Sequence, residues 1–153
     1  MKRAAAIDVG TNSVRLYIAD VTGERPAQID RDLLITRMGE RVDATGKLDD
    51  DALRRTVAAV AAYHQRARDA EADIVRIAAT SAVRDSRDRD RFVAAVRAAT
   101  GLVPEILTGE QEARYSFLGA AAELEGSGPF LVLDIGGGST EFVRGTRTVE
   151  AWT

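Results

Sequence analysis

LVLDIGGGSTEFV, residues 131–143, runs from an apolar segment through an aspartate and three glycines to two hydroxyl residues and a glutamate. AAIDVGTNSVRLYIADV, residues 5–21, has the same order: Asp, one apolar residue, Gly, two small residues and Ser. Apolar runs that flank residues favouring turns are typical of β-hairpins. The sequence therefore predicts the same hairpin twice.

Composition limits the classes of protein to which the chain can belong. Its 153 residues are 45% hydrophobic, as in a globular protein, and carry a net charge of −3, which gives no reason to expect non-specific nucleic-acid binding. The absence of cysteine excludes disulfides and thiol-ligated metals. No apolar run approaches the roughly 20 residues of a membrane span. We therefore expect a cytoplasmic protein without nucleic-acid or membrane partners.

The first part of the chain predicts a mixed α/β domain. Strands are expected at residues 4–9, 14–21 and 27–37, joined by short turns into an antiparallel meander, with a polar connector at 38–50. Helices expected at 50–68, 88–100 and 109–124 then alternate with strands at 73–80 and 102–107. The predicted order is β-β-β-α-β-α-β-α, a mixed sheet flanked by helices.

The rest of the chain predicts the start of a second domain. Residues 125–129, EGSGP, have a linker composition, and strands are expected at 130–135 and 140–145. Residues 147–153 could begin a third strand. We therefore predict a first domain over 1–124, and a linker with the opening hairpin of a truncated, similar domain over 125–153. An isolated hairpin needs a partner to bury its apolar face, so we expect it to pack on a second copy or to be ordered by crystal contacts.

The repeated Asp-x-Gly-x-x-Ser motif suits phosphate and metal binding. Glycine permits positive φ and brings backbone N–H groups close to a ligand, and successive N–H groups form an anion-binding concavity. An aspartate before the turn provides the oxygen ligands that Mg²⁺ prefers. The alternative is that each motif is an ordinary turn, since Asp and Gly are common turn residues. Because the motif occurs twice in the same context, we favour the interpretation that the two turns bind phosphate and metal.

Four segments carry a family resemblance: residues 5–21, RIAATSAVRDSRD (76–88), ILTGEQEARYSFLGA (106–120) and residues 131–143. Together they resemble the exopolyphosphatase / guanosine pentaphosphate phosphohydrolase family, in the actin, hexokinase and Hsp70 ATPase superfamily. The resemblance implies ribonuclease-H-like domains. It also implies a homodimeric phosphohydrolase that removes the terminal phosphate of polyphosphate or guanosine pentaphosphate.

The resemblance also implies roles for single residues. Glu112 would activate the attacking water, Glu141 would act with the metal and the water, and Arg84 would approach the substrate phosphates. The metal, Mg²⁺ or else Mn²⁺, would be bound by Asp8, Asp134 and Glu141. The phosphate-binding residues would be Gly10, Thr11, Asn12, Ser13, Gly136, Gly137, Gly138, Ser139 and Thr140.

Each assignment has an alternative in the sequence. Residues 108–111 read as a Thr-x-x-Gln capping box, which would make Glu112 an ordinary carboxylate of a first helical turn. Arg84 opens a run of alternating charge that is typical of a solvated helix start. Glu141 could be an outward strand residue. His64, the only histidine, is expected at the core or its edge, so a Ser–His or Cys–His triad is not expected.

Other functions stay open at this point. An ATP-dependent kinase or ATPase of the same superfamily is one alternative, and a non-catalytic phosphate- or alarmone-binding fragment is another. The residues do not choose between polyphosphate and guanosine pentaphosphate, and they leave chain-length preference, metal identity and oligomeric state open. A chain that ends inside its second domain is expected to be weakly active or inactive.

Overall fold

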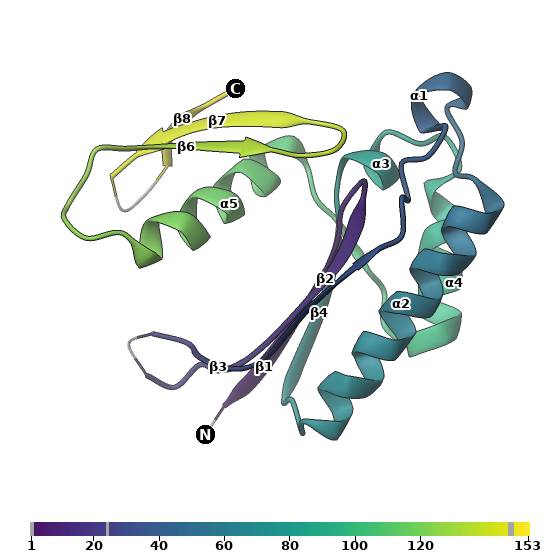
Figure 1. The fold of residues 1–153 in the computed structure, drawn as a ribbon, viewed down its shortest axis with the longest axis horizontal. Coiled ribbons are helices and arrows are strands. Elements are labelled where there is room, and N and C mark those ends of the chain that lie inside the picture. The colour runs from purple at the N-terminus through teal and green to yellow at the C-terminus, as the bar shows by residue number, and fades with distance from the viewer. Residues whose placement is uncertain (1, 24, 147–148) are drawn as a thin grey trace. The chain divides into compact units, whose positions relative to one another are not determined.

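The computed structural model describes residues 2–23, 25–146 and 149–153 (Figure 1). The chain divides into two compact units, Met1–Ile106 and Leu107–Thr153. Each unit contains one of the two predicted hairpins. Within the described residues, none of the helices has the length and apolar character that crossing a membrane requires.

The first unit is built on a five-stranded mixed sheet with the order β3-β2-β1-β4-β5. Its strands are β1 (Arg3–Val9), β2 (Ser13–Asp20), β3 (Ala27–Ile35), β4 (Ile74–Ala79) and β5 (Glu105–Ile106). β1, β2 and β3 form the predicted antiparallel meander, and β4 pairs with β1 in parallel. The mixed sheet and the predicted order of strands and helices are confirmed.

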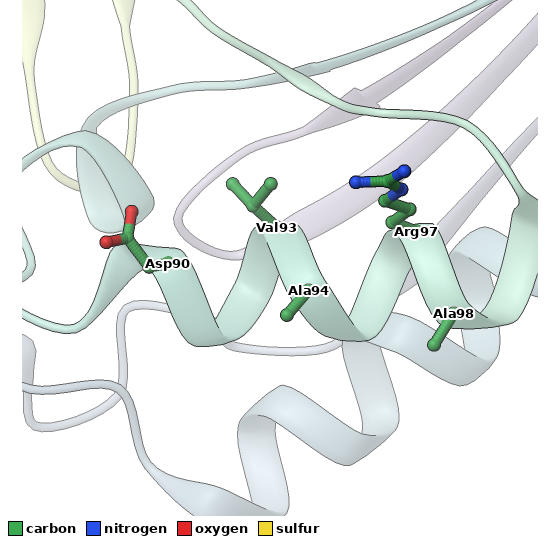
Figure 2. Close-up of a pocket in the computed structure, with 5 residues that line it drawn as sticks. All are labelled: Asp90, Val93, Ala94, Arg97 and Ala98. Carbon is green, nitrogen blue, oxygen red and sulfur yellow. The ribbon is translucent and has the colours of Figure 1, made fainter.

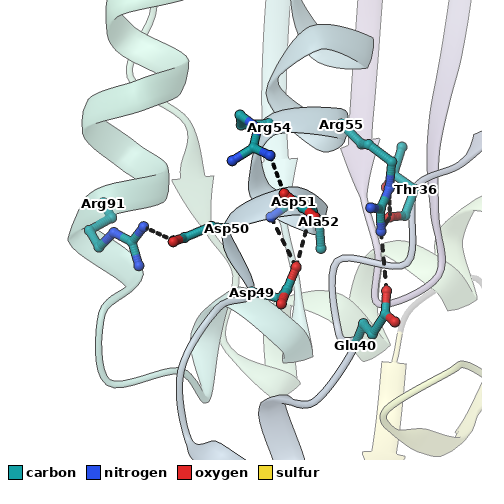
Figure 3. Close-up of polar contacts among 9 residues, drawn as sticks. All are labelled: Thr36, Glu40, Asp49, Asp50, Asp51, Ala52, Arg54, Arg55 and Arg91. Carbon is teal, nitrogen blue, oxygen red and sulfur yellow. Dashed lines mark hydrogen bonds and ion pairs between the residues drawn. The ribbon is translucent and has the colours of Figure 1, made fainter.

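Two helices, α2 (Asp50–Asp69) and α4 (Arg89–Thr100), lie side by side against this sheet (Figure 1). α2 begins where the Asp49 carboxylate accepts the N–H groups of Asp51 and Ala52 (Figure 3). Tyr63, at 1% exposure, is a core residue of α2. His64 is half-buried at the core edge, where burial, with a smaller contribution from Arg68, lowers its pKa.

The structure corrects three details of the predicted secondary structure. The connector at 38–50 contains the helix α1 (Val42–Thr45), and the predicted strand at 73–80 is followed at once by the helix α3 (Ser81–Arg84). Helices of four residues are too short to show a periodic pattern in sequence. The strand predicted at 102–107 is reduced to β5, which begins after Pro104 because proline cannot donate to a ladder.

The second unit consists of α5 (Gly109–Glu123), β6 (Phe130–Ile135), β7 (Thr140–Gly145) and β8 (Val149–Trp152), with the sheet order β6-β7-β8. β8 is the third strand that the sequence suggested. α5 packs on one face of the sheet through Ala113, Phe117 and Ala121. Along the chain, the division between the two compact units falls after Ile106, so α5 belongs to the unit that contains the second hairpin. The predicted domain boundary after residue 124 stays a prediction.

The other face of the β6-β7-β8 sheet is apolar and exposed. It carries Leu131, Leu133, Ile135 and Phe142, which are 48–73% exposed. These residues alternate along the strands with the side chains that pack on α5. The unpartnered apolar face expected for this hairpin is therefore present.

Candidate phosphate-binding and metal-binding site

Residues 10–13, which lie between the paired residues Val9 and Val14 and include Ser13 as the first residue of β2, are called loop 1. Val9 pairs with Val14, and the Gly10 N–H donates to the Ser13 carbonyl over 2.9 Å. Gly10 does not use the positive φ that glycine permits, and a Cβ there would lie an ordinary 3.5 Å from the Ser13 oxygen. The glycine is therefore not required by the turn itself; its missing side chain leaves the backbone open to a ligand.

The turn between β6 and β7, residues 136–139, is called loop 2, and Thr140 begins β7 directly after it. Ile135 pairs with Thr140, and the Gly136 N–H donates to the Ser139 carbonyl over 2.9 Å. Gly136 also lacks a positive φ, but a Cβ there would lie 3.1 Å from the Ser139 oxygen. The two loops thus have the same length and the same closing hydrogen bond.

The aspartate before loop 1 faces a cation. Asp8 is paired with Arg15 across β1 and β2, and its Oδ2 lies 3.7 Å from the Arg15 guanidinium. Both side chains are partly exposed, at 43% for Asp8 and 64% for Arg15. The charge of this predicted metal ligand is therefore offset by a neighbour on the next strand.

The aspartate before loop 2 faces another carboxylate. Asp134 pairs with Glu141 across β6 and β7, so the two side chains are neighbours on one face of the sheet. Asp134 Oδ2 accepts a 2.5 Å hydrogen bond from the Ser116 hydroxyl of α5. Glu141 is only 6% exposed, which overturns its reading as an outward strand residue. Within the described ranges no Lys or Arg forms an ion pair with Glu141.

A buried carboxylate without a cation is costly, and two adjacent carboxylates repel one another. Mg²⁺ is commonly bound by one or two carboxylates together with waters and substrate phosphates. The donor set of Asp134 and Glu141 therefore fits a small divalent cation. Among the described residues no group of three or more His, Asp or Glu side chains is placed to hold a metal.

Glu112 belongs to a capping box at the start of α5. Thr108 Oγ1 accepts from the Gln111 N–H at 3.2 Å, and Gln111 Oε1 accepts from the Thr108 N–H at 2.9 Å. The predicted capping box is confirmed, and it fixes the first turn that carries Glu112, whose side chain is half-buried. Ser116, the residue that contacts Asp134, lies four positions further on and shares a helix face with Glu112.

Arg84 lies in the last turn of α3, with its side chain 22% exposed and its Nε 3.3 Å from Asp85 Oδ1. α3 starts at the carboxyl end of β4, beside the carboxyl end of β1, because these strands are parallel. The hydroxyl groups of Thr11 and Ser81 are hydrogen-bonded at 2.9 Å. Loop 1 and α3 are thus in direct contact, and Ser81 is a neighbour of loop 1 that the sequence argument did not single out.

Two surface hollows contain none of the predicted site residues. The larger, about 540 Å³, is lined by successive turns of α4 at Asp90, Val93, Ala94, Arg97 and Ala98 (Figure 2). The smaller, about 350 Å³, lies at the start of α2, where Arg91 is paired with Asp50 (Figure 3).

Comparisons with known proteins relate the chain to a family of phosphatases. The sequence model of the Ppx/GppA phosphatase family matches residues 17–151. Exopolyphosphatase 2 of Mycobacterium tuberculosis is 44% identical over 99% of this chain and 50% of its own length. A guanosine-5′-triphosphate,3′-diphosphate pyrophosphatase of Photobacterium profundum is 33% identical over 92% of this chain and 28% of its own length.

A solved structure supports the fold. The crystal structure of the Ppx/GppA family member of Aquifex aeolicus has a TM-score of 0.88 and 35% identity, and the match covers 99% of this chain and 50% of that one. This chain thus spans half the length of the Mycobacterium and Aquifex proteins. Its mixed sheet, its helices and the match over residues 17–151 together show that the chain belongs to the Ppx/GppA phosphatase family.

Proposed function

We propose that this chain is part of a phosphohydrolase that removes the terminal phosphate of inorganic polyphosphate, of guanosine pentaphosphate, or of both. Relatives named exopolyphosphatase and guanosine-5′-triphosphate,3′-diphosphate pyrophosphatase support this substrate class. All of these substrates carry a phosphoanhydride between phosphate groups, so one phosphate-binding element serves each of them.

One observation carries the proposal: loops 1 and 2 have the same length and the same closing hydrogen bond, from the Gly10 N–H to Ser13 and from the Gly136 N–H to Ser139. Short glycine-containing turns with small neighbours leave backbone N–H groups free to bind phosphate oxygens. Phosphoryl transfer depends mainly on positioning and charge stabilisation, which such amides provide. Each loop is a phosphate-binding element for a substrate that carries several phosphates.

In this proposal Asp134 and Glu141 hold Mg²⁺, or Mn²⁺ in its place, because they are cross-strand neighbours on one face of the sheet and Glu141 is buried. The bound cation would neutralise phosphate oxygens during transfer. The hydrogen bond from Ser116 orients the Asp134 carboxylate. Asp8, which faces Arg15, is a weaker candidate for a metal ligand.

Glu112 is the proposed general base. It is half-buried, its helix turn is fixed by the capping box, and it shares a face of α5 with Ser116, which contacts Asp134. A carboxylate held near a carboxylate-bound cation can accept the proton of an attacking water. Arg84, on the helix next to loop 1, would supply positive charge to the substrate phosphates.

The proposal also includes a cytoplasmic homodimer, and light scattering on the purified protein tests the dimer. The activity is best tested in a protein that carries this chain at the length of its relatives. Phosphate release in the presence of Mg²⁺ would be measured with long-chain polyphosphate, guanosine pentaphosphate and ATP in parallel. Release from polyphosphate or guanosine pentaphosphate is expected.

The mutational test compares Glu112→Gln with Glu110→Gln, a second and exposed glutamate of the same helix turn. Loss of a general base costs roughly 100-fold to 10,000-fold in rate, and this is expected for Glu112→Gln only. Equal rates in the two variants would refute the role of Glu112. Release from ATP alone would indicate a kinase-like ATPase, and no release from any substrate would indicate a binding module.

A further inference from the structure

A four-residue segment after β3, Thr36–Arg37–Met38–Gly39, lies along loop 1 and is called the strap. The N–H groups of Thr36 and Arg37 donate to the Asn12 carbonyl at 3.0 and 2.9 Å, and the Gly39 N–H donates to the Thr11 carbonyl at 2.8 Å. Three of the four strap residues therefore hydrogen-bond to the backbone of the predicted phosphate loop.

The strap is also fixed from its other side. Met38 is fully buried in the core. Arg55 of α2 donates to the Thr36 carbonyl, with 3.1 Å from Nη2 to the oxygen, and pairs with Glu40 at 3.2 Å (Figure 3). The strap is thus held by hydrogen bonds to α2 on one side and to loop 1 on the other.

Arg37 has two unusual properties within this strap. Its φ of 54° is in the left-handed region, which residues other than glycine adopt rarely and which often marks functional positions. Its side chain is exposed, and among the residues that the structure describes its guanidinium forms no hydrogen bond or ion pair. Proteins usually place glycine, and sometimes asparagine, at a position with this left-handed backbone conformation.

We propose that Arg37 binds a phosphate group of the substrate beside loop 1. The inference rests on the proposed function and names one more residue that recognises the polyanion. Its backbone N–H lies 2.9 Å from the Asn12 oxygen, so the side chain starts at loop 1 itself. A guanidinium offers five N–H donors in a planar fork that matches phosphate oxygens, and amides alone offer no positive charge. The hydrogen bonds from the strap to loop 1 hold the backbone of Arg37 next to the loop.

The chain contains a matched control. Arg41 also has a left-handed φ, 66°, is also exposed, and also forms no side-chain hydrogen bond or ion pair among the described residues. It precedes α1, and its backbone makes no hydrogen bond to loop 1. Replacing either arginine by asparagine keeps a residue that tolerates this conformation, so the two variants differ only in where the charge is lost.

The test is calorimetric titration of tripolyphosphate into the protein at the length of its relatives. Arg37→Asn is expected to weaken binding roughly tenfold to a hundredfold, the effect of losing a charge-assisted hydrogen bond. Arg41→Asn is expected to leave the Kd unchanged, and both variants should keep the Tm of the parent. Arg37→Lys, which keeps the charge but not the fork, should lie between the parent and Arg37→Asn.

The outcomes separate this inference from the proposed function. Equal Kd values for the parent and Arg37→Asn, or equal weakening in Arg37→Asn and Arg41→Asn, would overturn the role of Arg37 and leave the phosphohydrolase proposal intact. A parent protein that does not bind tripolyphosphate would also overturn it. Tight binding that depends on Arg37, without release of phosphate from any substrate, would instead support Arg37 and refute the hydrolase.

Discussion

The two hairpins have the same loop but differ in the residue opposite the aspartate. Asp8 faces Arg15 across the first hairpin, and Asp134 faces Glu141 across the second. The first pair is an ion pair at 3.7 Å, whereas the second brings two carboxylates together, one of them buried. One duplicated motif therefore provides a charge-compensated hairpin suited to anions and an acidic hairpin suited to a cation.

The hairpins also differ in how their loops are supported. Loop 1 is hydrogen-bonded to the strap and to Ser81 of α3, in addition to its own closing bond. Among the described residues, the backbone of loop 2 forms one hydrogen bond outside the strand ladder, which is its closing bond from the Gly136 N–H to the Ser139 carbonyl. Within the described chain, loop 1 is thus the more constrained of two turns with the same length.

The largest expected effect tests the charge difference. Glu141→Gln should lower phosphate release by about 100-fold or more, because a bound cation contributes several kcal/mol of charge stabilisation. It should also raise the Mg²⁺ concentration for half-maximal release. Arg15→Gln, at the matching position of the first hairpin, should leave that Mg²⁺ concentration unchanged. Phosphate release measured at increasing Mg²⁺ gives both the maximal rate and the Mg²⁺ concentration for half-maximal release. If only Arg15→Gln changed that concentration, the assignment of the cation to the second hairpin would be wrong.

A smaller effect tests the support of loop 1. A Cβ at Gly39 would overlap the Cγ2 atom of Thr11, so Gly39→Ala should push the strap away from loop 1. Overpacking of this kind costs about 1–3 kcal/mol, and a loss of roughly tenfold in kcat/KM is expected as the loop shifts. The second-site change Thr11→Ser removes Cγ2 and keeps the hydroxyl. The double variant should therefore recover both Tm and kcat/KM; failure to recover would show that the strap does not act through this contact.

The periodic parts of the fold were predictable from the sequence, and the contacts that support the site were not. α2 and α4 were predicted within a residue at each end because long amphipathic segments have a clear period. α1 and α3 were not predicted because a helix of four residues is too short to show a helical period in the sequence. The order of Asp, Gly and Ser identified both loops, but not the strap, since Asn12 and Arg37 are distant in sequence and meet only in the folded sheet. The burial of Glu141 likewise depends on α5 packing over β7.

The glycines of the loops show a different kind of error. Glycine permits a positive φ in such turns, but neither Gly10 nor Gly136 adopts one. The left-handed conformation next to loop 1 belongs instead to Arg37, whose N–H donates to the Asn12 carbonyl. A sequence pattern can locate a turn, but it does not show which residue in the neighbourhood carries the strain.

The smallest expected effect compares the third strands of the two sheets. β3 is held to α2 by Arg66, which pairs with Asp30 at 2.8 Å and with Asp32, whereas the ion pair of β8, Arg144 to Glu150, is exposed and 3.9 Å long. The hydrogen bond from Arg66 lowers the pKa of Asp32. Because the folded pKa is below the unfolded value of about 3.9, this stabilisation is present above that pH and is lost as the pH falls through the folded pKa.

Hydrogen exchange of the β3 amides, corrected for the intrinsic pH dependence, should therefore increase as the pH falls below about 4. Arg66→Gln should raise exchange in β3 at neutral pH and flatten its response to acid, because the charge that lowers the pKa of Asp32 is gone. β8 serves as the internal control, since it has no bond to Arg66 and its exchange should be the same in both proteins. An acid response in β3 that survives Arg66→Gln would show that the strand is held by its ladder with β2 and not by this ion pair.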